Sequence, residues 1–234
     1  MNPLNALNQS PMLAGSAKAA TTGPPVIVGI TGASGTILAM SLIKALLMAN
    51  RAVAMVATEK ALPVILQEEG LKITGASKTE KRDAVLGYLK QRLDLPDTTP
   101  ETLLTLYGNH ELDAAISSGT CLTQGMVIMP CSMGTLGRIS AGIGDNLVAR
   151  AADVTLKEAR KLVLVPREAP LNAIHLENML KLARLGVVII PPMLTFYLPD
   201  YLTLQGQIDV TVGKVLDQLQ IEHTLYKRWG ETAS

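Results

Sequence analysis

Three short segments combine polar or charged residues with glycine or proline, and each directly follows an apolar run. They are Gly32-Ala33-Ser34-Gly35, Ser132-Met133-Gly134-Thr135 and Pro166-Arg167-Glu168-Ala169-Pro170. Glycines in the first two segments allow tight backbone geometry, and the amides of a following helix can hold a phosphate or a polar ring edge. In the third segment, an arginine between two prolines presents a planar fork suited to phosphate or an electron-rich ring. Together the three segments favour a phosphate-bearing cofactor.

Each segment also has a purely structural interpretation. Ser34 or Thr36 could cap a helix, and the second segment could be an ordinary loop with a capping residue. Arg167 and Glu168 could form a surface ion pair, although Glu168 is also placed to steer a proton. A further set of basic side chains fits either a solvated helix or a cation for an anionic substrate: Lys157, Arg160 and Lys161.

Composition and missing motifs exclude several functional classes. The net formal charge is +1, which provides no long-range field for gathering nucleic acid or an anionic membrane. The three histidines are widely separated and there are two cysteines, so we expect no metal site. No apolar run reaches the ~18 residues of a membrane span, and the first 25 residues lack a secretory signal. We therefore expect a cytoplasmic protein without nucleic-acid or membrane partners.

The first segment matches neither a P-loop nor G-x-G-x-x-G, and no G-x-S-x-G elbow occurs, which disfavours an α/β-hydrolase.

The elements that must position these segments follow from the apolar pattern. Residues 1–25 show no sustained period and predict a flexible tail, whereas 26–230 predict one folded domain. Short apolar runs predict strands at 26–31, 52–58, 103–107, 126–129, 162–165 and 187–190. Helical spacing predicts helices near 37–50, 61–69, 79–93, 146–158, 173–185 and 207–219. This alternation favours a single doubly wound α/β domain with a mainly parallel sheet, which is a Rossmann-like architecture.

In this order, the segments resemble the UbiX/Pad family of flavin prenyltransferases from about Val26 to Trp229. The resemblance rests on the three segments above and on four others: Arg150-Ala151-Ala152-Asp153-Val154, His175-Leu176-Glu177-Asn178-Met179, Pro191-Pro192 and Phe196-Tyr197. It implies a flavoprotein fold that binds FMN. It also implies transfer of a dimethylallyl group from dimethylallyl monophosphate to N5 and C6 of reduced FMN, without a metal. The product would serve a UbiD-type decarboxylase as its cofactor. The family resemblance further implies a homododecamer with sites shared between subunits.

The same resemblance implies roles for individual residues. The FMN-binding positions would be Gly32, Ala33, Ser34, Thr58, Ser132, Met133, Gly134, Thr135 and Arg167. Tyr197, Lys214 and Lys157 would contact the prenyl phosphate, and the catalytic set would be Ser34, Glu68, Glu168 and Lys157.

The sequence departs from the family pattern at several positions. Thr58-Glu59-Lys60-Ala61 replaces a commoner Ser-Lys-Ala-Ala, Leu112 stands where relatives carry an aromatic residue, and Lys214 stands where arginine is frequent. We therefore expect retained activity with altered substrate affinity. One alternative is an FMN-binding carrier without prenyl transfer. Another is a flavin-dependent cysteine decarboxylase, whose active-site histidine and substrate-recognition motif we cannot place. Direct decarboxylation of an aromatic acid is less favoured.

Overall fold

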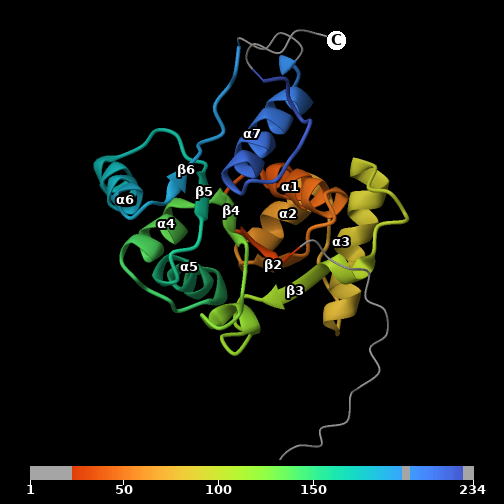
Figure 1. The fold of residues 1–234 in the computed structure, drawn as a ribbon, viewed down its shortest axis with the longest axis horizontal. Helices are drawn as coiled ribbons and strands as arrows, with labels where there is room; N and C mark the ends of the chain where they lie inside the picture. The colour runs from red at the N-terminus through yellow and green to blue at the C-terminus, as the bar shows by residue number, and fades with distance from the viewer. Residues whose placement is uncertain (1–22, 197–200, 229–234) are drawn as a thin grey trace, which may run out of the picture.

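The computed structural model describes residues 23–196 and 201–228, in which a parallel sheet of six strands lies between two helical layers (Figure 1). The strand order is β3-β2-β1-β4-β5-β6. The strands are β1 (Val26–Ile30), β2 (Val53–Ala57), β3 (Leu104–Gly108), β4 (Gly125–Cys131), β5 (Leu162–Pro166) and β6 (Val188–Ile189). The helices are α1 (Thr36–Met48), α2 (Ala61–Glu69), α3 (Lys78–Leu93), α4 (Met133–Ser140), α5 (Leu147–Lys157), α6 (Ala173–Arg184) and α7 (Leu204–Gln218), with short 3₁₀ turns η1 (Glu101–Leu103) and η2 (Ala115–Ser117). The predicted doubly wound α/β fold is confirmed, and every strand pair in it is parallel.

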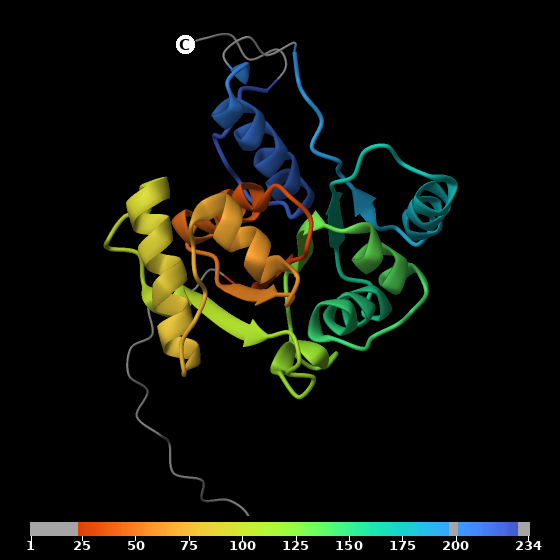
Figure 2. The ribbon, with the colours of Figure 1, turned by 180° about the vertical axis from the view of Figure 1, so that it is seen from behind.

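The strands are apolar throughout because helices cover both faces of the sheet. Along β1, Val26 and Val28 pack into a core formed with α1, α2, α3 and α7. Ile27 points the other way, into a second core formed with α4, α5 and α6. This alternation follows from the two-residue period of a strand. Figure 2 shows the two helical layers from behind.

The chain enters the sheet at β1, builds β2 and β3 on one side, and then crosses to β4 on the other side. The carboxyl ends of β1 and β4 are therefore neighbours at the point where the strand order reverses. In open α/β sheets this is where ligands bind.

One helix differs from the sequence prediction. Residues 133–144 are rich in glycine and no helix was predicted there, but Met133–Ser140 form α4. Ser132 caps this helix by accepting a hydrogen bond from the Thr135 amide, and Leu136 and Ile139 are buried beneath it. Capping and burial thus outweigh the low helix propensity of the glycines.

Some of the predicted features fall outside the described ranges. These are residues 1–22 of the predicted tail, residues 229–230 at the end of the predicted domain, and Tyr197. Within the described ranges, none of the helices has the length and apolar character that a membrane crossing requires. In the same ranges, no group of three His, Cys, Asp or Glu side chains is arranged to hold a metal ion.

Candidate functional site

The first two predicted segments meet at the carboxyl edge of the sheet, where the buried side chain of Thr31 joins them. Its hydroxyl donates to the Pro130 carbonyl at 2.7 Å and accepts from the Ser132 amide at 2.7 Å. Thr31 is fully buried. One side chain therefore sets the spacing between the turn after β1 and the turn after β4.

The third segment reaches the first through Arg167, which follows β5. Its Nε donates to the Ser34 carbonyl at 3.2 Å, and its amide donates to the Cys131 carbonyl at 3.3 Å. Ser34 and Arg167 line one cavity of about 230 Å³, together with Pro192, Met193, Leu194 and residues of α1 and α7. The cavity therefore combines polar groups of Ser34 and Arg167 with apolar side chains.

Close backbone approach explains the glycines of the first turn. A Cβ on Gly32 would lie 2.7 Å from the Cβ of Lys60 and 3.1 Å from its carbonyl oxygen. Gly35 has a φ of 99°, a left-handed conformation that favours glycine, and it caps α1 without a side-chain hydrogen bond. Neither Ser34 nor Thr36 is the N-cap residue, so the simple capping interpretation of this segment is wrong.

The amides at the start of α1 are instead bound by Glu68, near the end of α2. Its carboxylate accepts from the Gly35 amide at 3.0 Å, the Thr36 amide at 2.9 Å and the Thr36 hydroxyl at 2.8 Å. Burial raises the pKa of Glu68, but hydrogen bonds from the Ser34 side chain and from Thr36 and Gly35 outweigh it and hold the pKa below its ordinary value. Glu68 is therefore an anion beside Ser34 at neutral pH.

Two features of this edge fit a bound phosphate or polyhydroxyl group. The hydroxyl of Thr58, after β2, is buried and has no hydrogen-bond partner within the described chain, which is costly unless a ligand completes it. A Cβ on Gly134, in the first turn of α4, would have nothing within 4 Å, so the start of that helix faces open space. A phosphorylated cofactor fits these residues.

Two other predicted residues, Glu168 and Lys157, lie at opposite edges of the sheet. Glu168 is exposed beside Arg167, and its carboxylate accepts from the Ala169 amide at 3.1 Å. Lys157 ends α5 just before β5 begins, and it forms an ion pair with Glu158. Helices of this fold run antiparallel to the strands, so Lys157 lies at the opposite edge of the sheet. Within one chain the structure does not bring it to the cavity.

Lys214 lies on α7, one turn beyond Thr211, which lines the cavity. It is exposed, and its Nζ stands 5.4 Å from the centroid of the Tyr226 ring. Tyr226 donates from its hydroxyl to Asp217, and Arg228 donates to the same carboxylate at 2.8 Å. A Cβ on Gly213 would lie 2.5 Å from the Tyr226 ring, so the ring packs directly on the helix beside Lys214.

Sequence reasoning did not identify Thr31 as a residue of this site. It ends an apolar run, and its role depends on Pro130 and Ser132, about a hundred positions away, so the local sequence does not show that role. A polar residue at the last position of a predicted buried strand was the available clue.

Comparison with known proteins finds similar proteins over most of the chain. A model of the family described as Flavoprotein matches residues 15–229. A flavin prenyltransferase UbiX from Alkalihalophilus pseudofirmus is 45% identical over 87% of this chain and 95% of its own. Among solved structures, a dodecameric FMN-dependent UbiX-like decarboxylase from Escherichia coli O157:H7 is 41% identical with a TM-score of 0.72, covering 88% of this chain and 100% of its own. AnUbiX (PadA1), in complex with FMN and dimethylallyl pyrophosphate, is 34% identical with a TM-score of 0.73, covering 90% of this chain and 99% of its own.

Proposed function

Because the chain belongs to the Flavoprotein family and to its UbiX-like flavin prenyltransferases, we propose that the carboxyl-edge site binds reduced FMN and prenylates it from dimethylallyl monophosphate. The observation that carries this assignment to the site is the convergence of Ser34 and Arg167 on one cavity. The prenylated product would pass to a UbiD-type decarboxylase.

The residues that would hold FMN are those of the two turns, with Thr58 and Arg167. The amides at the start of α4 and the unpartnered Thr58 hydroxyl suit its phosphate and ribityl groups. When bound in its reduced form, FMN supplies the nucleophilic N5 and the ring carbon C6, so the protein need not provide a nucleophile. Its own task is to bind both reactants and to manage charge and protons.

Charge on the leaving phosphate calls for cations at the cavity. As the C–O bond of the donor breaks, Arg167 and Lys214 would stabilise the phosphate that departs. Lys214 provides a point charge where arginine would provide a fork, which is consistent with altered donor affinity. The apolar walls, among them Leu38, Leu194 and Ile208, would keep water from the allylic carbon.

Proton handling falls to Ser34, Glu68 and Glu168. Since Glu68 is ionised and bound to the start of α1, it is suited to orient the Ser34 hydroxyl, and its lowered pKa makes it a weak base and a poor proton donor. The exposed carboxylate of Glu168 beside Arg167 could relay the proton to solvent.

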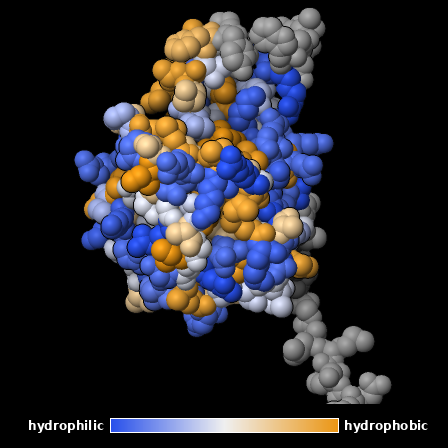
Figure 3. All heavy atoms as spheres, turned by 90° about the vertical axis from the view of Figure 1, so that its left-hand side faces the viewer, coloured by the Kyte–Doolittle hydropathy of each residue, from blue (hydrophilic) through white to orange (hydrophobic). Residues whose placement is uncertain are grey.

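Completion of the site requires a second copy of the chain. Lys157 lies at the wrong edge of its own sheet, so it would act from a neighbouring subunit of a homododecamer. Large apolar side chains exposed on α6 support such packing, namely Ile174, Leu176 and Leu180. Figure 3 shows the face on the α6 side, where apolar atoms are exposed among polar ones. Native mass spectrometry would test this assembly, and a monomer that retains full activity would contradict it.

The experiment for the activity is anaerobic incubation with reduced FMN and dimethylallyl monophosphate, followed by mass spectrometry of the extracted flavin. We expect a flavin heavier by one prenyl unit. Bound but unmodified FMN, with the donor left intact, would support the carrier alternative instead.

Lys214→Ala should raise the donor concentration needed for half-maximal rate and leave FMN binding in place. A matched control is Lys90→Ala on α3, whose partly exposed side chain pairs with Asp97 at 3.5 Å. Equal donor dependence in the two variants would rule out the role of Lys214.

A further inference from the structure

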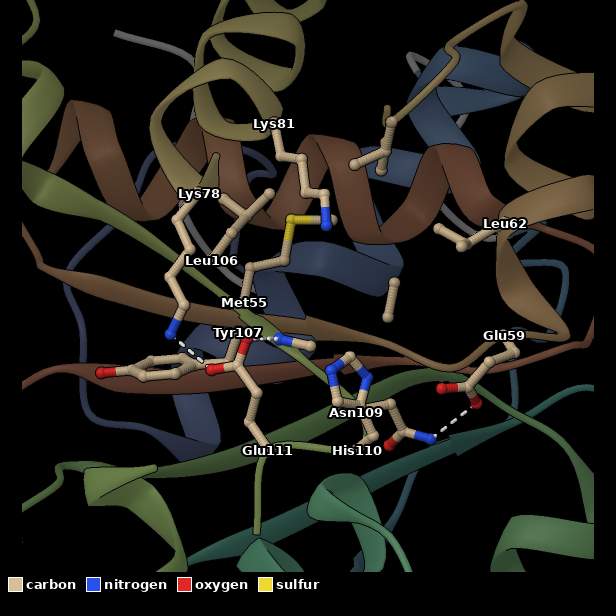
Figure 4. Close-up of a pocket in the computed structure, with 13 residues that line it drawn as sticks. Met55, Glu59, Leu62, Lys78, Lys81, Leu106, Tyr107, Asn109, His110 and Glu111 are labelled. Atoms are coloured by element: carbon tan, nitrogen blue, oxygen red, sulfur yellow. Dashed lines mark hydrogen bonds and ion pairs between the residues drawn. The ribbon is translucent and has the colours of Figure 1, made fainter. Parts of the chain in front are cut away.

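A second cavity, of about 240 Å³, lies at the carboxyl ends of β2 and β3, beneath the start of α3 (Figure 4). None of the proposed FMN or donor residues lines it. It adjoins the proposed FMN site through Glu59, which lines the cavity and directly follows Thr58. The prenyl-transfer mechanism makes no use of this cavity.

The two carboxylates of the cavity are already engaged. Glu111 pairs with Lys78 and accepts from the Gly108 amide at 3.0 Å. Burial raises the pKa of Glu111, but the Lys78 and Gly108 hydrogen bonds outweigh it and hold the pKa below its ordinary value. Glu59 accepts from the amide nitrogen of the buried Asn109 at 2.9 Å. The acidic groups therefore need no cationic ligand.

Two nitrogen-bearing side chains of the cavity, Lys81 and His110, are in a different situation. Figure 4 shows the Lys81 ammonium reaching in from α3 toward Met55, and the His110 ring standing below it. Within the described residues, neither side chain forms a hydrogen bond or ion pair; Lys81 is half-buried, whereas His110 is exposed and near enough to Glu111 to help lower the pKa of that carboxyl. A partly desolvated ammonium beside apolar side chains is stabilised by an anion.

The position of His110 depends on a glycine. A Cβ on Gly108 would lie 2.8 Å from Cε1 of His110 and 3.0 Å from the Glu111 carboxylate. Both side chains fold back over the end of β3 only because that Cβ is absent. The polar side of the cavity is thus a defined arrangement that a single methyl group would disturb.

The remaining wall is apolar and comes from β2, α2, β3 and the loop before α3, with Met55, Leu62, Ile73 and Leu106 contributing side chains. We infer that this cavity binds a small organic anion, a carboxylate or a phosphate monoester carried on a short apolar chain or ring. The anionic group lies between Lys81 and His110, and the apolar part lies against Met55 and Leu106. This site is separate from the flavin edge and does not depend on prenyl transfer.

The test uses four probes that separate charge from apolar character: benzoate, phenyl phosphate, benzyl alcohol and inorganic phosphate. Binding to the full chain is measured by calorimetry and by NMR shifts, without any activity readout. We expect saturable binding of benzoate or phenyl phosphate, and at least tenfold weaker binding of benzyl alcohol and inorganic phosphate. The stronger of the first two identifies the preferred anion.

Location is tested with Lys81→Met, which keeps the length of the side chain and removes its charge. We expect at least tenfold weaker binding of the preferred anion, because a charge-assisted hydrogen bond is lost. Lys90→Met on the same helix is the matched control and should bind as the unmodified chain does. Equal affinities for Lys81→Met and Lys90→Met would overturn the inference, as would inorganic phosphate binding as tightly as phenyl phosphate.

Discussion

The buried hydroxyl of Thr31 offers the sharpest test of how this site is held together. Thr31→Val keeps the shape of the side chain and removes both hydrogen bonds, to the Pro130 carbonyl and from the Ser132 amide. The Pro130 carbonyl retains a contact with the Thr31 amide at 3.3 Å, but the Ser132 amide loses its acceptor. The substitution therefore leaves one donor unsatisfied in a partly buried turn.

The expected cost follows from these contacts. A lost hydrogen bond contributes about 1 kcal/mol, and an unsatisfied donor costs about 1–3 kcal/mol. The free energy of unfolding should therefore fall by about 2–4 kcal/mol. For a domain of this size, that lowers the melting temperature by about 4–16 °C. Re-ordering one loosened residue on binding costs a further ~1–2 kcal/mol, which is about 5–30-fold in the Kd for FMN.

The assay pairs thermal unfolding with an FMN titration followed by flavin fluorescence. Thr105→Val, at an exposed position on β3, is the control and should change neither quantity by much. A Thr31→Val protein that melts and binds FMN like the control would refute the idea that this hydroxyl sets the spacing of the two turns.

Three further predictions concern other parts of the chain. The pKa of Glu68 lies below its ordinary value of 4.5, so its ionised carboxylate should stabilise the fold fully above pH 4.5 and lose this effect as the pH falls through the lowered pKa. The difference in melting temperature between the unmodified chain and Glu68→Gln should therefore narrow on acidification. A difference that stays constant with pH would contradict this. Gly213→Ala should destabilise by about 1–3 kcal/mol because its Cβ would overlap the tyrosine ring packed there, whereas Gly87→Ala, with open space around it, should stabilise by about 0.5–1 kcal/mol; denaturant titrations that show equal effects would refute the packing argument. Iodoacetamide should label Cys121 and spare Cys131, which is fully buried and whose thiol pKa burial raises to about 12, as peptide mass mapping can check.

Much of the fold could be predicted because local pattern and global topology agree. Apolar runs such as 26–31 and 162–165 can be covered on both faces only in a parallel sheet, and the structure uses them so. The polar turns after these strands lie at one edge of the sheet because parallel strands end there together. The family resemblance then implied FMN and the prenyl donor.

What could not be predicted depends on contacts between distant segments. The placement of Glu68 on the amides of α1 depends on how α2 folds back over the first turn, thirty-odd residues away. The cavity at β2 and β3 combines Met55, Lys81 and His110, which no local pattern associates. The position of Lys157 at the far edge follows from helix direction, but a motif comparison alone does not reveal it.

The short strand β6, at one edge of the sheet, limits how copies of the chain can meet. It spans two residues, Val188–Ile189, and Pro191 and Pro192 follow it closely. Neither proline has an N–H to offer a neighbouring strand, so the sheet cannot readily continue into a second molecule along this edge. Copies of the chain would then associate through side chains on helix faces, and assemblies formed in this way can be closed and finite. Open-ended polymerisation through backbone pairing of sheet edges is disfavoured.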